Sequence, residues 1–238
     1  MTDAHCHVSC GDPAVREFLV GRDFFGVHPW ETLEECKVES VECKVEGELR
    51  SRLLANPNAG VGEIGLDRLK VRDIPPRMRE VFEAQLAFAF ELNRPVVLHG
   101  AKCWGQVVET IKVQSAFAAK PLVPSRGKAV LVQGVEASGT RFLFHGFSRS
   151  DGLIPDIVKL NGFISVGPAV LNDHAVNYRE LVKKIPLDRL LVETDRTSSS
   201  DSPSISDVLA KTADIINLPS AELERITDEN ADRFLGVV

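Results

Sequence analysis

The chain has 238 residues, of which 44% are hydrophobic, and its formal net charge at pH 7 is −6. This length and apolar content suit one domain of barrel size, so we expect a single domain over residues 1–238. The net charge gives no electrostatic basis for broad, non-specific binding of nucleic acid, although a local basic rim could still contact phosphates.

The cysteines and the hydropathy pattern indicate the cellular environment. Five cysteines, an odd number without paired C-x-x-C spacing, argue against a disulfide framework and a zinc ribbon. No uninterrupted apolar run approaches the length of a membrane span. We therefore expect an unprocessed cytoplasmic protein with no membrane attachment, and no obligate protein partner is evident.

Short apolar runs that end in polar residues predict strands. In chain order they cover residues 1–5, 24–26, 59–62, 95–99, 141–145, 162–166 and 189–193. Amphipathic stretches between or after them predict helices within residues 73–93, 177–185, 206–216 and 220–235. This alternation of strand and helix indicates a parallel α/β architecture.

Two stretches are less regular. Residues 31–47 contain a near-duplication with heptad spacing, which predicts one or two turns of surface helix. Residues 120–139 are rich in glycine and proline and predict a long connection, either a lid or an extra turn before the fifth predicted strand.

The positions of the polar residues favour a closed barrel over an open sheet. They stand at the C-terminal ends of at least five runs, and a barrel gathers such ends around one mouth, whereas an open sheet spreads them along a line. The sequence has no glycine-rich phosphate loop after a strand, which weakens the dinucleotide and P-loop alternatives. We predict a TIM-like (β/α)8 barrel, distorted, with a short or missing eighth strand, because only seven strands are evident.

The first predicted strand carries Asp3-Ala4-His5-Cys6-His7. Side chains alternate between the two faces of a strand, so His5 and His7 share one face with Asp3, whereas Cys6 points away. Two imidazoles can therefore reach one metal ion. A purely structural histidine pair is the alternative for this motif taken alone.

Four later strand ends carry further metal-ligating residue types. Glu63 stands between glycines, His99 and His145 each follow a buried run, and Asp195 follows another. The alternatives are a solvated loop carboxylate for Glu63 and core histidines with satisfied hydrogen bonds. For Glu193, on the same strand face as Asp195, a supporting and a structural role are equally open.

Six motifs in this order resemble the TatD family of metal-dependent deoxyribonucleases, within the amidohydrolase-type barrels. They are Asp-x-His-x-His, Gly-Val-His-Pro, Gly-Glu-Ile-Gly-Leu-Asp, Arg-Pro-Val-Val-Leu-His, His-Gly-Phe-Ser and Val-Glu-Thr-Asp. The resemblance covers nearly the whole chain, residues 3–230, and implies a distorted TIM barrel and a two-metal hydrolase. It further implies that one metal is held by His5, His7 and Asp195, that the second is held by His99 and His145, and that Glu63 bridges them.

The resemblance also suggests substrate-binding residues and marks departures. His28 of Gly-Val-His-Pro is a substrate-side candidate, with a structural role as the alternative. The family often carries an arginine two residues after the fourth-strand histidine; this chain has Ala101 there and Lys102 next to it, so Lys102 is the candidate phosphate contact. Residues 196–201 replace the small residues and prolines that usually follow the last aspartate, so substrate scope would differ accordingly.

The expected function is a deoxyribonuclease that hydrolyses the phosphodiester bonds of DNA. Two divalent ions would activate a water molecule and polarise a phosphoryl oxygen, while Asp195 orients the water and accepts its proton and Glu63 fixes the spacing of the ions. The donor set favours Zn²⁺ or Mn²⁺, with Mg²⁺ possible. Asp3 is a candidate partner for a ligating histidine.

Two other functions remain open at this stage. Related barrels cleave C–N or ester bonds of small molecules with the same kind of metal site. A degenerate barrel retained as a binding protein is the third alternative, and the occupied ligand positions argue against it.

Overall fold

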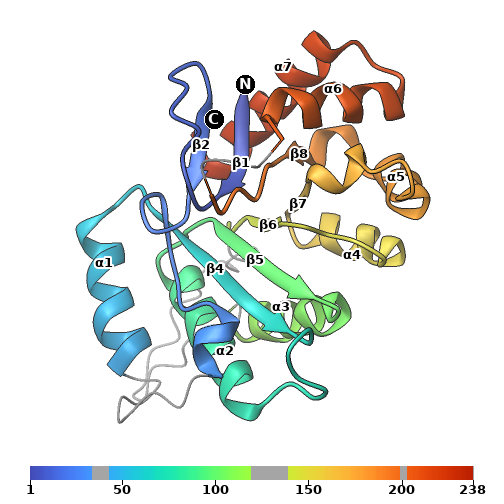
Figure 1. Cartoon of the computed structure of the whole chain (residues 1–238). Helices are drawn as coiled ribbons and strands as arrows, with labels where there is room; N and C mark the ends of the chain where they lie inside the picture. Colours follow the sequence, from blue (N-terminus) through green and yellow to red (C-terminus); the bar gives the residue numbers. More distant parts are fainter. Residues whose placement is uncertain (34–42, 119–138, 199–202, 238) are drawn as a thin grey trace, which may run out of the picture.

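The computed structural model describes residues 1–33, 43–118, 139–198 and 203–237 and has an α/β architecture (Figure 1). The described residues contain eight strands, each short except β4. They are β1 Thr2–Cys6, β2 Arg16–Leu19, β3 Phe24–Phe25, β4 Gly60–Asp67, β5 Val96–Ala101, β6 Phe142–Phe144, β7 Gly162–Val166 and β8 Leu190–Val192.

All recorded strand pairs are parallel. Strands β3 to β8 form a six-stranded sheet in chain order, and β1 pairs with β2. A bridge between Val20 and Phe24 joins β2 to β3. After β8, the amide of Asp195 donates to the carbonyl of His5 at 3.0 Å and joins that end of the sheet to β1. Backbone contacts therefore link the two sheets at both edges, as the predicted distorted barrel requires.

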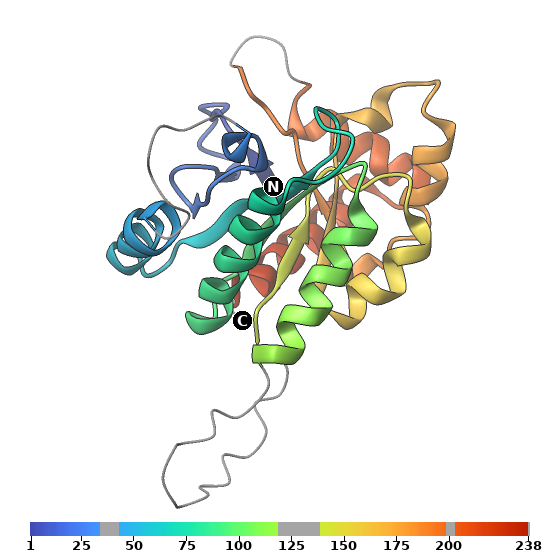
Figure 2. The same cartoon turned by 90° about the horizontal axis from the view of Figure 1, so that it is seen from below.

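Helices cover the outside of the strands, and Figure 2 shows α2, α3 and α4 side by side there. The α-helices are α1 Arg50–Ala55, α2 Pro76–Glu91, α3 Trp104–Ala118, α4 Ile154–Lys159, α5 Val176–Val182, α6 Ile205–Ile216 and α7 Ser220–Leu235. Shorter helical segments are Pro29–Thr32, Asp151–Leu153, Pro168–Leu171 and Leu187–Arg189, all 3-10, and the π-helical Cys43–Leu49. None of the helices in the described ranges is both long and apolar enough to cross a lipid bilayer.

The distortion lies in the first part of the barrel. Residues 7–15 and 20–23 join β1 to β2 and β2 to β3 without a helix, although a regular TIM barrel has a helix after every strand. The strand that the sequence pattern did not show is β2, which has four residues. The expected eighth strand is therefore present and short.

Strand alternation separates an inner face from an outer face. Val97, Leu143 and Leu191 are buried together in one apolar cluster. Residues two places apart share a strand face. The same inner face therefore carries polar groups nearer the C-terminal mouth, where the residues two positions later are His99, His145 and Glu193.

Aromatic rings fill the opposite end of the interior. Phe18, Phe24 and Phe163 surround Phe234 of α7, with each ring centroid within 6.1 Å of that of Phe234. Phe234 is fully buried. The last turn of α7 thus closes the amino-terminal end of the barrel, and the polar mouth lies at the other end.

The other predictions have mixed outcomes. Helix α7 has the predicted bounds, α6 begins one residue before its predicted start, α2 lies within three residues of its predicted bounds, and α5 covers most of its range. Helix α3 was not predicted. Of residues 31–47, those at 34–42 lie outside the described residues, and residues 43–47 belong to the π-helical segment. The connection predicted at 120–139 lies almost wholly outside the described residues.

Candidate metal centre

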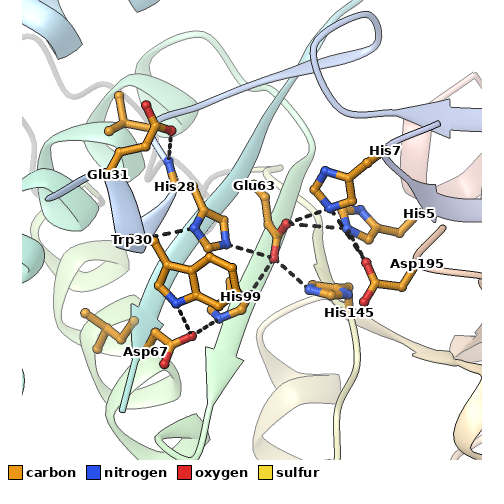
Figure 3. Close-up of polar contacts among 12 residues, drawn as sticks. His5, His7, His28, Trp30, Glu31, Glu63, Asp67, His99, His145 and Asp195 are labelled. Carbon is orange, nitrogen blue, oxygen red and sulfur yellow. Dashed lines mark hydrogen bonds and ion pairs between the residues drawn. The ribbon is translucent and has the colours of Figure 1, made fainter. Parts of the chain in front are cut away.

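Glu63 of β4 is buried at the centre of the mouth and is surrounded by imidazoles (Figure 3). Its Oε1 lies 2.6 Å from Nδ1 of His99 and 2.7 Å from Nε2 of His145. Its Oε2 lies 3.5 Å from Nε2 of both His5 and His7. Each oxygen of one carboxylate therefore faces different imidazoles, which suits a carboxylate that bridges two cations.

Asp195 completes the group on the Oε2 side. Its Oδ1 lies 3.6 Å from Nε2 of both His5 and His7. The Nε2 atom of His5 is buried and has no hydrogen-bond partner among the described residues. Leaving a buried polar atom unpaired costs free energy, and a bound cation would remove that cost. The donor set and this unpaired nitrogen fit a divalent metal.

His28 joins the group on the Oε1 side. Its Nε2 lies 3.7 Å from Oε1 of Glu63, and its ring centroid lies 4.7 Å from that of His99. The amide of Trp30 donates to Nδ1 of His28 at 3.2 Å, which leaves Nε2 directed at the carboxylate. Donor atoms of His28, Glu63 and His99 lie within 4.8 Å of one another. The candidate substrate contact is therefore also within reach of a bound metal.

Carboxylates lie behind two of the candidate ligands. Oδ2 of Asp67 lies 2.7 Å from Nε2 of His99, and Oε1 of Glu193 lies 3.6 Å from Nδ1 of His145. Metal-binding histidines commonly have such a partner on the ring nitrogen that does not bind the metal. The indole nitrogen of Trp30 also donates to Oδ2 of Asp67 at 2.7 Å.

Asp67 was not among the predicted site residues. It stands four positions after Glu63 on β4, so the even spacing of an extended strand would have placed both carboxylates on one face. The predicted strand stopped at residue 62, and this signal was missed for that reason.

Asp3 differs from its expected role. Its carboxylate accepts hydrogen bonds from the amide of Thr194 at 2.9 Å and from the Thr194 hydroxyl at 2.6 Å, rather than from an imidazole. Burial raises the pKa of Asp3 to about 6, although the hydrogen bonds from Thr194 oppose this rise. Asp3 thus ties β1 to the residue before Asp195 and holds that side chain near His5 and His7.

The charges of the cluster support one another. Burial raises the pKa of Glu63, but the imidazoles, His145 first among them, outweigh it and hold the pKa well below its usual value. Burial lowers the pKa of His145, but Glu63 and Glu193 hold it well above its ordinary value. The pKa of His99 is raised in the same way by Asp67 and Glu63, against the effect of burial. Without metal, the carboxylates therefore favour protonated imidazoles.

Gly65 allows β4 to lie close to β5 at this point. It has a φ of 148°, and a Cβ there would overlap the carbonyl oxygen of His99. A side chain at this position would push the two strands apart and move Glu63 away from His99. The glycines around Glu63 serve the close backbone approach that the sequence indicated.

Two cavities open beside the cluster and share Asp195, Gly146, Ser148 and Arg149 as lining residues. The first has a volume of about 860 Å³ and includes His174 in its lining. The second, of about 670 Å³, is lined by His99 and by the exposed Lys102 among others. The six predicted ligands and both predicted substrate contacts therefore lie at one mouth.

Comparison with known proteins identifies the family. The family model described as TatD related DNase matches residues 22–236. A curated relative, the uncharacterized metal-dependent hydrolase YabD of Bacillus subtilis, is 28% identical over 186 residues, covering 74% of this chain and 65% of YabD. The 3'-5' ssDNA/RNA exonuclease TatD of Klebsiella pneumoniae is 27% identical over 191 residues, covering 74% of this chain and 65% of that protein.

Solved structures agree on the fold. The TatD homologue YJJV from Escherichia coli gives a TM-score of 0.67 at 21% identity, covering 96% of this chain and 79% of that one. A hydrolase TatD family protein from Entamoeba histolytica gives a TM-score of 0.64 at 17% identity, covering 92% and 75% of the two chains.

The chain spans 65% and 60% of the lengths of the first two curated relatives. The family model also begins after His5 and His7, so the grouping of those two imidazoles with Glu63 rests on the geometry described above. Because the family model covers most of the sequence and the barrel agrees with it, the chain belongs to the TatD related DNase family.

Proposed function

We propose that the chain is a divalent-metal-dependent hydrolase that cleaves the phosphodiester bonds of DNA. The observation that carries this proposal is the carboxylate of Glu63, whose two oxygens face different imidazoles. The relative from Klebsiella pneumoniae, named as an exonuclease on single-stranded DNA and RNA, supports a nucleic-acid substrate.

Two metal ions are part of the proposal. His5, His7 and Asp195 would hold one, His99 and His145 the other, and Glu63 both. This set is rich in nitrogen donors, so Zn²⁺ or Mn²⁺ would bind better than Mg²⁺, which prefers oxygen ligands.

Different residues of the chain would then have different roles in the reaction. Divalent ions at these positions would lower the pKa of a water molecule and offset the negative charge that develops on a phosphoryl group. Asp195 would orient the water and accept its proton, because its side chain is 47% exposed and open to the mouth. His28 and Lys102 would contact the substrate.

We further propose that residues 1–238 form one domain and that the protein is cytoplasmic. The interior cluster that includes residues from β1, β8 and α7 supports a single domain, since it joins both ends of the chain. The free thiols of Cys6, Cys10 and Cys103 support a reducing compartment.

The second metal position can be tested with His99→Ala. We expect the variant to lose about one equivalent of metal by elemental analysis and at least roughly 100-fold in turnover of a single-stranded oligonucleotide, because both a ligand and its carboxylate partner are uncoupled from the site. His174→Ala, at the rim, is the matched control. Unchanged metal content and unchanged turnover in His99→Ala would rule out the assigned position.

The bond that is cleaved needs a separate test. A panel of oligonucleotides, small amides and small carboxylic esters should show turnover of the oligonucleotides. Activity confined to the amides or esters would reject the nuclease and support a small-molecule hydrolase instead.

A further inference from the structure

Two cations at the mouth have an unusual backbone conformation. Lys102 follows β5 with a φ of 56°, and Arg149 follows β6 with a φ of 57°. The other non-glycine residues with positive φ in the described ranges are Asn93, Asn161, Asn217 and Asp195. Asparagine and aspartate adopt this left-handed region more readily, since their short side chains can hydrogen-bond locally. Lysine and arginine lack that compensation, so a requirement for their side chains is the simplest reason for their presence.

Both cations line the 670 Å³ cavity, which continues to His99, His145 and Asp195. Each side chain is exposed, and the structure records no hydrogen bond or ion pair from either one to a described residue. Other exposed cations are paired with a carboxylate, as Lys184 is with Asp151. The two free cations therefore have their charge available to a ligand.

The lining of this cavity indicates what the ligand would be. Its volume lies within the range of about 300–1,000 Å³ typical of sites for small organic ligands, which is more than one phosphate group needs. Ser148 and Ser150 add hydroxyl groups, and Leu69, 56% exposed, adds an apolar surface. Positive charge, hydroxyl groups and an apolar side chain together suit a sugar–phosphate backbone with its bases.

The larger cavity, which also includes Asp195 in its lining, has a different character. Arg149 is its only lysine or arginine among the described lining residues, and Pro168, Ala169 and Tyr178 supply much of its wall. Lys102 and Arg149 thus occur together only in the lining of the 670 Å³ cavity.

We propose that the 670 Å³ cavity binds the nucleic-acid backbone on one side of the bond to be cleaved, with Lys102 and Arg149 contacting two successive phosphates on that side of the reacting one. The proposal rests on the proposed function, and it assigns Arg149 as a substrate-binding residue and gives the bound strand a defined side of the metal cluster.

Glycine variants test this assignment. Lys102→Gly and Arg149→Gly remove the charge and suit the left-handed backbone, so they should fold at least as well as the parent. The measurement is fluorescence anisotropy of a labelled single-stranded phosphorothioate oligonucleotide, which resists hydrolysis, over a series of salt concentrations in the presence of Mn²⁺. We expect roughly a five- to tenfold rise in Kd for each variant at low salt.

The salt dependence is the sharper readout. Each lost phosphate contact should reduce the slope of log K against log salt by about 0.7, and the double variant by about 1.4. Lys102→Arg and Arg149→Lys should restore the slope because they keep the charge. The control is Lys159→Ala with Arg225→Ala, which has the same change in net charge at exposed positions on α4 and α7. A double glycine variant with the slope of this control would overturn the proposal.

Hydrolysis of a small diester tests the proposed function independently of the cavity. Hydrolysis of bis(p-nitrophenyl) phosphate by the unmodified protein reports the metal centre alone. If the unmodified protein cleaves the diester and the oligonucleotide while the glycine variants bind like the control, the cavity assignment fails and the function stands. If it cleaves neither, the proposed function fails, and the anisotropy series still decides whether the cavity binds a phosphodiester chain.

Discussion

A substitution of Asp67 should show how much the orientation of His99 matters for metal binding, because it leaves the candidate metal ligands themselves in place. Its carboxylate accepts hydrogen bonds from His99, from the indole of Trp30 and from the amide of Leu69, the last at 2.5 Å. Burial raises the pKa of Asp67, but His99, the largest opposing influence, lowers it below its ordinary value. The group is therefore ionised and holds His99 in one orientation.

For Asp67→Asn we expect metal affinity to fall about 10- to 100-fold, since the neutral amide cannot accept all three hydrogen bonds and orients His99 less firmly. Isothermal titration calorimetry with Mn²⁺ measures the change in metal affinity. Asp73→Asn, an exposed carboxylate in the following loop, is the control. An affinity within twofold of the parent would show that Asp67 does not position the ligand.

The site residues that could be predicted are those that directly follow recognisable apolar runs. His99 and His145 are of this kind, and their position relative to Val97 and Leu143 follows from strand alternation alone. Asp67, the partner of His99, does not follow such a run but lies at the end of β4, beyond the predicted end of that strand at residue 62.

Backbone conformation makes a prediction for the segment after β6. Arg149 is held in the left-handed region, which costs a residue with a Cβ about 1–2 kcal/mol, while glycine loses about 0.5–1 kcal/mol in backbone entropy. Arg149→Gly should therefore raise the free energy of unfolding by up to about 1 kcal/mol. Asn217→Gly, at the same φ of 57°, should gain less because asparagine tolerates this region. Urea unfolding measures both, and a loss of stability in Arg149→Gly would contradict the argument.

A second prediction concerns the contribution of helix α7 to stability. Phe234 is fully buried among three other phenylalanine rings, so Phe234→Ala should cost about 3–5 kcal/mol of unfolding free energy. Leu54→Ala, at a side chain that is 58% exposed, should change it by no more than about 0.5 kcal/mol. Urea denaturation of the metal-free proteins is the measurement. Equal effects of the two substitutions would show that α7 does not close the barrel.

The helices and strands differ in how clearly the sequence predicts them. Helix α7 was predicted with its bounds because its buried positions Leu223, Thr227, Ala231 and Phe234 follow one helical face. Helix α3 was missed because exposed apolar residues such as Val113 and Phe117 blur its periodicity. Strand β2 has too few residues for an alternating pattern to be evident.

At the scale of the whole molecule, stability should depend on pH in opposite directions with and without metal. The raised pKa values of His99 and His145 stabilise the metal-free protein below about pH 6.5, and this contribution is lost as the pH rises through the folded-state pKa values. The lowered pKa values of Glu63 and Asp67 stabilise it above about pH 4.5, and this contribution is lost as the pH falls. The metal-free protein should therefore be most stable between about pH 4.5 and 6.5.

Bound metal should reverse the loss of stability at higher pH, since metal binds neutral imidazoles and displaces their protons. The melting temperature with Zn²⁺ or Mn²⁺ should rise relative to the chelated protein as the pH increases from about 6 to 8. Thermal melts at matched pH, with and without chelator, measure the difference. A metal-free protein that gains stability over this range would contradict the assigned charge states.

The hydrogen bonds between Asp3 and Thr194 join residues 191 positions apart in the sequence. The first and last strands meet there, and His5, His7 and Asp195 come together only when they do. Such long-range contacts form late in folding, because chain entropy is lost before they are gained. A growing chain on the ribosome thus cannot complete the proposed metal centre until β8 has been synthesised and has docked against β1. The proposed metal centre is therefore assembled together with the closed fold.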